Sequence, residues 1–194
     1  MTKIIGLTGG IGSGKTTIAN YFRELGIPVY IADDEGKKIT ESPEILKSIK
    51  TIFGEEVFDN QKLNRQKVAQ IVFENPKKLK QLNAIIHPEV KKHFKNWVSQ
   101  HSNTPFVIKE AAILFESGSY KDCDLVISVV APLELRIKRV MERDLVSREE
   151  VLKRINNQLT DAKRIEKSSF VIENSDIYQA KLQVDKILKK IAIQ

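Results

Sequence analysis

The residues best suited to chemistry form a glycine-rich stretch near the N-terminus, residues 9–16, which reads GGIGSGKT. It matches the pattern G-x-x-x-x-G-K-[ST], in which backbone N–H groups converge on a chain of phosphates and glycines let the loop curl closely around it. Lys15 supplies a cation near the β- and γ-phosphates, and the Thr16 hydroxyl can ligate Mg²⁺. An apolar run precedes the stretch and a helical pattern begins near Thr17, which is the context that this loop requires. The implied ligand is ATP or GTP.

A dinucleotide-binding loop is the alternative for this stretch, because Asp33 and Asp34 follow about twenty residues later, where a ribose-binding acid would lie. That fold requires the pattern G-x-G-x-x-G. Starting from Gly10, the third glycine position falls on Lys15, where a small residue is needed for close helix packing. The glycine loop therefore favours a nucleoside triphosphate.

The two acids have a possible chemical role of their own, because they come just after the short apolar run of residues 29–31. In open parallel sheets the carboxyl ends of the strands line the ligand crevice. A kinase uses a carboxylate there to accept the proton of the attacked hydroxyl and to orient its oxygen, and Asp33 is our candidate. A helix-capping role suits Asp33 or Asp34 equally well, so the pattern alone leaves both roles open.

A basic helix face lies in the second half of the chain. Arg136, Arg139 and Arg143 are spaced three and four residues apart, so they share one face of a predicted helix. Arg154 and Gln158 lie one turn apart on the next predicted helix. Such a basic pair of helices suits a lid that covers transferring phosphates and excludes water. Solvated surface arginines are the other interpretation, and helix geometry does not decide between them.

Further along, ordered motifs resemble those of the dephospho-coenzyme A kinase family over nearly the whole chain. They are T-G-G-I-G-S-G-K-[ST]-T at residues 8–17, "D-A-D" at 31–33, L-N-x-I-x-H-P at 82–88, "D-x-P-L-L-[FY]-E" at 110–116, R-x-x-x-R-D at 139–144, R-I-x-x-Q at 154–158, and a late Asn at 174. The resemblance implies an enzyme that transfers the γ-phosphoryl group of ATP to the 3′-hydroxyl of dephospho-coenzyme A, the last step of coenzyme A synthesis. ATP would be the phosphoryl donor and Mg²⁺ its companion ion.

The resemblance also implies roles for particular residues. The catalytic residues would be Asp33, Lys15 and Arg143, and the metal ligand would be Thr16. ATP would be bound by Ile11, Gly12, Ser13, Gly14, Lys15, Thr16, Thr17, Arg139 and Asn174. The acceptor would be bound by Asp33, His87, Glu116 and Arg154. A polar or packing role for His87 is as compatible with its position as direct contact with the acceptor.

Four positions depart from the family pattern. Ile31 replaces the first acid of D-A-D, which leaves Asp33 as the carboxylate to carry over. Ala112 and Ile113 replace Pro and Leu in the following motif. Glu110 replaces Asp at the end of an apolar run, where it could support Mg²⁺ through water or form a structural ion pair.

Other functions remain as alternatives. A kinase for nucleosides or nucleotides would share the glycine loop. A GTPase-like switch would carry the guanine-specificity element N-K-x-D, which does not occur in the sequence. A nucleic-acid binder would interleave basic residues with stacking aromatics, but aromatic residues make up only 7% of the chain and the Lys-rich segments lack them.

The elements that must position these residues form an alternating pattern. Short, almost continuously apolar runs are typical of parallel strands that are buried on both faces. They lie at residues 4–7, 29–31, 106–108, 125–130 and 170–172. We therefore expect an α/β fold of the P-loop kinase type: a doubly wound, five-stranded parallel sheet with a helical insertion and a lid. The nucleotide-binding core would comprise residues 1–33 and 104–194, with the lid at about 139–158, and the acceptor-binding insertion residues 34–103.

Capping signals place several of the helices. We expect one over residues 43–53, one over 64–73 with Asn64 as its N-cap, and one that begins at Pro76. Pro88 should kink or break this last helix near His87. Ser147 and Glu150 have capping-box spacing for a helix that continues to about Thr160, and a final helix covers residues 178–193.

Composition sets the class of protein. The chain has 194 residues and a net charge of +7, which suits a polyanionic ligand but does not identify one. Cys123 is the only cysteine, so an internal disulfide is impossible and a reducing compartment is expected. The sequence has no apolar run of 18 residues and no signal-peptide pattern. We expect a cytoplasmic enzyme that acts on small molecules, without a membrane, a nucleic acid or an obligate protein partner.

Overall fold

The computed structural model describes residues 2–193 and divides the chain into two compact units. One unit runs to Ile31 and resumes at His101, and the other comprises Ala32–Gln100. Each is described separately below. The expected insertion, residues 34–103, is offset by a few residues from the second unit.

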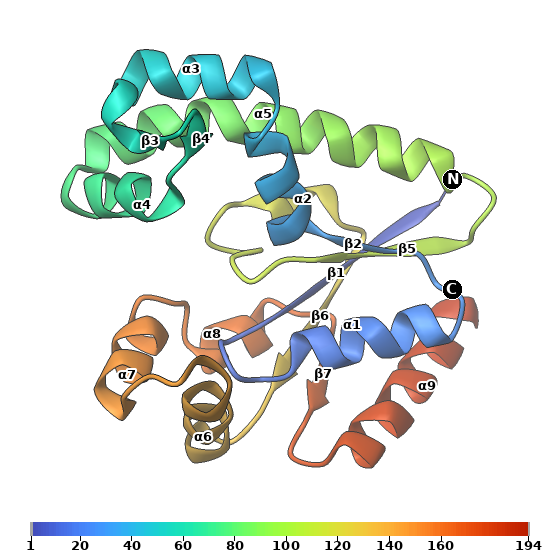
Figure 1. Ribbon diagram of the computed structural model, residues 1–194. Coiled ribbons are helices and arrows are strands. Elements are labelled where there is room, and N and C mark those ends of the chain that lie inside the picture. The colour runs from blue at the N-terminus through green and yellow to red at the C-terminus, as the bar shows by residue number, and fades with distance from the viewer. Residues whose placement is uncertain (1, 194) are drawn as a thin grey trace. The chain divides into compact units, whose positions relative to one another are not determined.

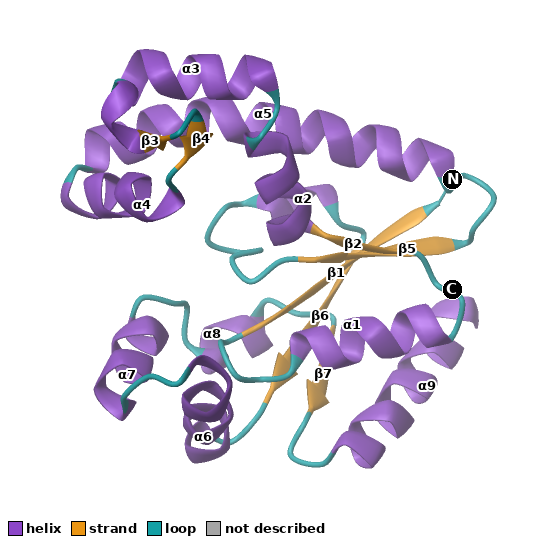
Figure 2. Cartoon of the chain, in the orientation of Figure 1, coloured by secondary structure: helices purple, strands orange, loops and turns teal. Residues whose placement is uncertain are grey.

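The first unit is built on a five-stranded parallel sheet (Figure 1, Figure 2). Its strands are β1 (Lys3–Gly9), β2 (Val29–Ile31), β5 (Phe106–Glu110), β6 (Leu125–Val130) and β7 (Phe170–Glu173). Their order across the sheet is β2-β5-β1-β6-β7, with every neighbouring pair parallel. The predicted parallel α/β sheet is confirmed, and β1, which leads into the glycine loop, is its central strand.

The core of this unit lies between the sheet and two helices, α1 (Lys15–Glu24) and α9 (Ile177–Ile193). The two helices lie side by side against the sheet (Figure 1). The buried core side chains are Ile5, Leu7, Ile18, Ala19, Phe22, Ile108, Ile127, Val129, Ile172, Ala180, Val184, Ile187 and Ile191. Because the apolar runs pair on both edges and pack on this layer, the carboxyl end of β1 is held rigidly beneath the glycine loop.

Three further helices follow β6: α6 (Leu133–Asp144), α7 (Arg148–Asn156) and α8 (Asp161–Glu166), while a 3₁₀ turn, η2 (Ser119–Asp122), precedes that strand. The predicted capping box is confirmed, since Ser147 accepts from the Glu150 N–H and the Glu150 side chain accepts from the Ser147 N–H. The predicted extension of this helix to Thr160 is wrong. The helix ends at Asn156, and Thr160 is the N-cap of α8, where its hydroxyl accepts from the Lys163 N–H.

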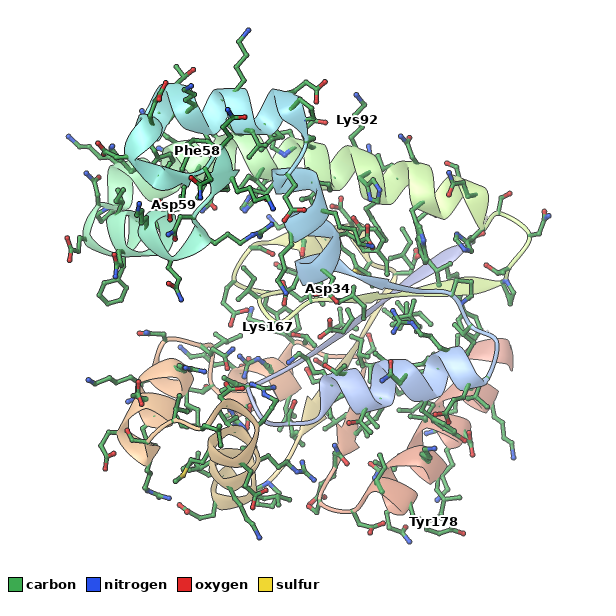
Figure 3. The ribbon with its side chains drawn as sticks, in the orientation of Figure 1. Asp34, Phe58, Asp59, Lys92, Lys167 and Tyr178 are labelled. Carbon is green, nitrogen blue, oxygen red and sulfur yellow. The ribbon has the colours of Figure 1, made fainter. Side chains whose placement is uncertain are left out.

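The second unit is mainly helical. It contains α2 (Ala32–Thr40), α3 (Pro43–Phe53), a 3₁₀ turn η1 (Glu55–Val57), strands β3 (Phe58–Asp59) and β4 (Lys62–Leu63), α4 (Arg65–Glu74) and α5 (Pro76–Gln100). Figure 3 labels Phe58 and Asp59 on the short hairpin, which the sequence patterns did not predict. Asn60 and Gln61 both have positive φ there, as a tight two-residue hairpin turn requires. A separate core, formed by Ile45, Ile49, Phe53, Val57 and Val68, holds the unit together.

The caps of this unit agree with the sequence, but the effect of Pro88 does not. The Asn64 side chain accepts from the N–H groups of Gln66 and Lys67, and that of Asn75 accepts from the Lys78 N–H. Pro88 is predicted to kink or break α5 near His87; a break is wrong, because the helix, 25 residues long in all, continues through Pro88. A proline removes one helical hydrogen bond, and α5 is supported by packing against α2, α3 and α4. Within residues 2–193, no helix is both long enough and apolar enough to cross a membrane.

Candidate active site

The glycine loop has the backbone that its sequence predicts. It leaves β1 at Gly9 and enters α1 at Lys15, and Gly14 caps this helix in the left-handed conformation, with φ 88°. Gly12 also has a positive φ, of 78°. A side chain at Gly12 would clash with the backbone carbonyl of Arg136, and one at Gly14 would clash with the side-chain amide of Asn174. Only glycine fits both positions, because each combines a left-handed backbone with a close neighbour.

The start of α1 provides the chemistry for binding phosphate. Lys15, Thr16 and Thr17 form its first turn, which contains no acidic residue. The N–H groups of a first turn have no partner within the helix, and the helix dipole places partial positive charge there. Thr16 and Thr17 are exposed and Lys15 is half-buried. The predicted loop residues are thus brought together at a helix N-terminus that suits an anionic phosphate chain.

Several carbonyl groups of the loop are bound by side chains from elsewhere in the same unit. Arg136 Nε donates to the Ile11 carbonyl at 2.9 Å, and Arg139 donates to the Gly12 carbonyl at 3.4 Å. Asn174 Nδ2 donates to the Ser13 carbonyl at 2.8 Å. A carbonyl oxygen repels a phosphate oxygen, so these donors hold the repulsive groups of the loop in protein contacts.

Three predicted ATP-binding residues, Ile11, Ser13 and Asn174, are more enclosed by the protein than their sequence positions indicate. The N–H of Ile11 donates to Gln158 Oε1 at 2.9 Å, so both peptide groups of Ile11 are engaged by the protein. Ser13 is 1% exposed, and its N–H donates to the Gly10 carbonyl at 3.1 Å. Asn174 is also buried, and its own carbonyl accepts from Arg139 Nη2 at 3.0 Å. In this structure Asn174 supports the loop through Ser13.

Next to the loop, an ionic network built on two buried arginines connects three segments. Arg136, 4% exposed, donates to Asp161 at 2.6 Å, and Asp161 also accepts from Arg164 at 3.0 Å. Arg164, 1% exposed, lies 3.3 Å from Glu116, which also accepts from the Leu159 N–H at 2.9 Å. The network joins Glu116, a predicted acceptor-binding residue, through Arg164 and Asp161 to Arg136, which binds the loop at the Ile11 carbonyl.

The predicted basic face separates into three different environments. Arg136 is buried in the network, Arg139 contacts the loop and Asn174, and Arg143 is exposed. Arg143 forms a bidentate pair with Asp144, at 2.7 and 3.0 Å, and Arg154 donates to the same carboxylate at 2.7 Å. Hydrogen bonding to Asp144 raises the pKa of Arg143, and the two arginines hold the pKa of Asp144 below its ordinary value. Arg143 and Arg154, both predicted site residues, therefore lie together.

Asp33 and His87 belong to the second unit. Asp33 is exposed in the first turn of α2, two residues beyond the end of β2. Its neighbour Asp34, labelled on α2 in Figure 3, pairs with Lys37 at 3.1 Å, and Glu35 pairs with Lys38 at 2.7 Å. Within the described residues Asp33 has no such partner. His87 is exposed on α5.

Sequence reasoning did not identify Asp161 and Arg164 as part of the site, nor the contact of Gln158 with the loop. The Thr160 cap and the i,i+3 spacing of Asp161 and Arg164 could have indicated α8. The burial of Arg164 has no local signal, and neither has the pairing of Asp161 with Arg136, which binds a loop about 150 residues earlier, because both depend on tertiary packing.

A glycine loop at the carboxyl end of a central parallel strand, with a lysine opening the next helix and basic helices beside it, defines the chain as a P-loop kinase. The family model for dephospho-CoA kinase matches residues 3–179. The chain belongs to the dephospho-CoA kinase family, and it is an ATP-dependent kinase.

Individual relatives agree with this assignment. The dephospho-CoA kinase of Bacteroides fragilis is 43% identical over 171 residues, which cover 88% of this chain and 83% of that protein. The crystal structure of TT1252 from Thermus thermophilus matches with a TM-score of 0.91 and 35% identity, over 97% of each chain. Dephospho-CoA kinase from Campylobacter jejuni matches with a TM-score of 0.72 and 26% identity, over 98% of each chain. These matches favour this family over a nucleoside or nucleotide kinase.

Proposed function

We propose that this chain transfers the γ-phosphoryl group of ATP to the 3′-hydroxyl of dephospho-coenzyme A, giving coenzyme A and ADP. The observation that carries the proposal is the intact glycine loop, with Lys15 at the start of α1, in a chain that belongs to this family. The first unit binds ATP, and the second unit, Ala32–Gln100, binds the acceptor. The single cysteine, Cys123, suits a reducing compartment, and we place the enzyme in the cytoplasm.

ATP binds with its phosphates at the N-terminus of α1. Lys15 neutralises charge on the β- and γ-phosphates, and the first-turn N–H groups donate to phosphate oxygens. The remaining ATP contacts are those predicted for Gly12, Gly14, Thr17 and Arg139. Ile11, Ser13 and Asn174 act by holding the backbone of the loop, because both peptide groups of Ile11 bind side chains of Arg136 and Gln158, and the Ser13 carbonyl accepts from the Asn174 side chain.

Asp33 accepts the proton of the acceptor hydroxyl. As the hydroxyl oxygen bonds to the γ-phosphorus, the bond from that phosphorus to the β–γ bridging oxygen breaks, and ADP leaves with the electron pair. The proton passes to the Asp33 carboxylate, which also orients the attacking oxygen. The support for this role is that Asp33 is exposed and, among the described residues, lacks the lysine partners of Asp34 and Glu35.

Mg²⁺ fits this site through the Thr16 hydroxyl, which is exposed in the first turn of α1. Within residues 2–193 no cluster of three His, Cys, Asp or Glu side chains could hold a metal ion. A single protein oxygen nevertheless suits Mg²⁺, which keeps several waters and takes its other ligands from substrate phosphates. When bound, Mg²⁺ would supply positive charge against the charge that develops on the phosphates during transfer.

Arg143 neutralises charge on the transferring phosphoryl group, and Arg154 binds the acceptor beside it. Both arginines can release their shared partner, Asp144, and bind a phosphate instead. The cost is small, because a solvent-accessible ion pair contributes only about 0–1 kcal/mol. His87 and Glu116 complete the proposed acceptor contacts. Glu116 is held by Arg164 and the Leu159 N–H, which would fix its orientation toward the acceptor.

The direct test is a reaction of the purified protein with ATP, Mg²⁺ and dephospho-coenzyme A. We expect ADP and coenzyme A in equal amounts, with the new phosphate assigned to the 3′ position by phosphorus NMR. Excess EDTA should stop turnover if Mg²⁺ is required. Adenosine and nucleoside monophosphates serve as competing acceptors, and turnover on these without product from dephospho-coenzyme A would contradict the proposal.

A further inference from the structure

Ile11 lies in the glycine loop, and its carbonyl, its N–H and its side chain all contact the segment formed by α6, α7 and Gln158. Its carbonyl accepts from Arg136 of α6, and its N–H donates to Gln158, just beyond α7. Its side chain packs against a small core formed by Ile137, Val140 and Val151 from the same two helices. One loop residue is thus the meeting point of α6, α7 and the phosphate-binding backbone.

We propose that Gln158 is a positioning residue for nucleotide binding, which fixes the Ile11 peptide and thereby the shape of the glycine loop. The proposal rests on ATP binding at this loop, as argued above. The 2.9 Å hydrogen bond from the Ile11 N–H joins groups 147 residues apart in the chain.

The loop needs such a restraint because glycines flank Ile11 on both sides. Gly10 and Gly12 allow the close curvature, but they also allow the peptide between residues 10 and 11 to rotate. Rotation of that peptide would break the bond from the Ser13 N–H to the Gly10 carbonyl, as well as the bond to Gln158. Gln158 therefore supplies a restraint that the glycines themselves cannot provide.

The two side chains that hold Ile11 are anchored differently. Arg136 is buried and also bound to Asp161, so its position is fixed by the ionic network. Gln158 is half-buried in the short connection between α7 and α8, and its N–H donates to Ile155 at the end of α7. Because of this attachment, a displacement of α7 either carries the Ile11 N–H with it or breaks the bond. The position of α7 and the shape of the loop are therefore linked.

The test compares Gln158→Met, which removes the acceptor with little change of size, with Gln158→Glu, which keeps an acceptor oxygen. Asn156→Ala, an exposed site at the end of α7, is the matched control. Amide hydrogen exchange at Ile11, followed by NMR, reads the hydrogen bond directly. We expect exchange to be about tenfold faster in Gln158→Met, as the loss of one hydrogen bond implies, and near wild type in the other two variants.

Nucleotide affinity is the second measurement. Calorimetry should show ADP binding about tenfold weaker in Gln158→Met, with the KM for dephospho-coenzyme A and the melting temperature little changed. The carboxylate introduced by Gln158→Glu adds negative charge near the phosphates, and this charge alone weakens ADP binding. Whether the variant keeps the hydrogen bond from the Ile11 N–H is therefore read from the exchange rate and not from the ADP affinity. If Gln158→Met does not fold, Gln158→Asn replaces it, because its shorter side chain does not reach Ile11.

Two results would overturn the proposal. Unchanged exchange at Ile11 in Gln158→Met would mean that the hydrogen bond does not restrain the loop. Faster exchange with unchanged ADP affinity would make Gln158 a structural residue only. ADP binding needs no acceptor, so these results can be read even if the wild-type protein fails to phosphorylate dephospho-coenzyme A. The two proposals therefore fail independently.

Discussion

At the scale of the residue, Asp33 differs from the acids beside it. Asp34 and Glu35 are neutralised by lysines one turn later, whereas Asp33 has no such partner in the described chain. The sequence left open whether Asp33 caps the next helix. Because α2 begins at Ala32, Asp33 is already the second residue of the helix and lies beyond the N-cap position. The structural role that remains for Asp33 is a favourable interaction of its negative charge with the helix dipole in the first turn. Its proposed chemical role is proton transfer.

Substitution of Asp33 separates these two roles. Asp33→Asn keeps the size of the side chain but cannot accept the proton, so we expect kcat to fall by about 10²–10⁴-fold. ADP affinity, measured by calorimetry, should stay near wild type. Asp34→Asn is the control, because it removes an exposed ion pair worth about 0–1 kcal/mol and should leave kcat within about twofold. An unchanged kcat in Asp33→Asn would return the residue to a helix-stabilising role.

At the scale of the element, the strands were the most predictable part of the fold. Val29–Ile31 and Leu125–Val130 have the bounds that the apolar runs indicate, and the other three strands extend by one to three residues beyond their runs. Burial on both faces forces almost every residue of a central parallel strand to be apolar, so its sequence is easy to recognise. Helices with a side-chain cap, such as the one after Asn64, were also predictable, because the cap is a local interaction.

Elements and contacts that depend on the rest of the chain were missed. Six-residue α8 is too short for a helical period, and the α5 helix continues through Pro88 because neighbouring helices support it. The glycine loop was predictable because its chemistry requires a fixed local spacing. The side chains that hold it were not, since burial of Arg136 and the reach of Gln158 arise only when α6 and α7 pack beside the loop.

The proposed lid, α6 and α7, carries a prediction at this scale. Arg143→Ala should reduce kcat much more than it weakens ADP binding, if the guanidinium acts mainly on charge that develops during transfer. Arg148→Ala is a matched control, because Arg148 is also exposed in the proposed lid and forms a bidentate pair with Glu134. Steady-state kinetics with calorimetry distinguish the cases. A loss confined to ADP affinity would contradict a transition-state role for Arg143.

At the scale of the whole molecule, the net charge of +7 is divided between different uses. Lys15, Arg139, Arg143 and Arg154 belong to the proposed site, while Arg136 and Arg164 are buried in an ionic network with Asp161 and Glu116. Lysines such as Lys37, Lys38 and Lys67 form exposed pairs with acids. The excess of positive charge indicated a polyanionic ligand, but only the glycine loop identified the kind of anion.

The single cysteine gives a measure of the stability of the whole first unit, for which we propose nucleotide binding. Cys123 follows η2 and lies close to Gly6 of β1, and its thiol donates to the Ser119 carbonyl at 3.7 Å. Burial raises the pKa of the Cys123 thiol from 9.0 to about 11. Thiolate is the reactive form, so at pH 8 the folded protein should react with iodoacetamide about 100-fold more slowly than the chain in urea. If iodoacetamide reaches the thiol only when the unit unfolds, ADP should slow the labelling further, because ADP binds only the folded state.

The same shift predicts how stability depends on pH. Well below pH 9 the thiol is almost fully protonated in both states, so it contributes little pH dependence to the free energy of unfolding. Between pH 9.0 and about 11 the unfolded thiol ionises while the folded thiol keeps its proton, so the free energy of unfolding must fall as pH rises. Cys123→Ala removes this contribution but leaves every other titrating group in place. Urea unfolding of both proteins should therefore show wild type losing stability relative to Cys123→Ala across this range, and parallel pH profiles would mean that the thiol is not buried as the fold places it.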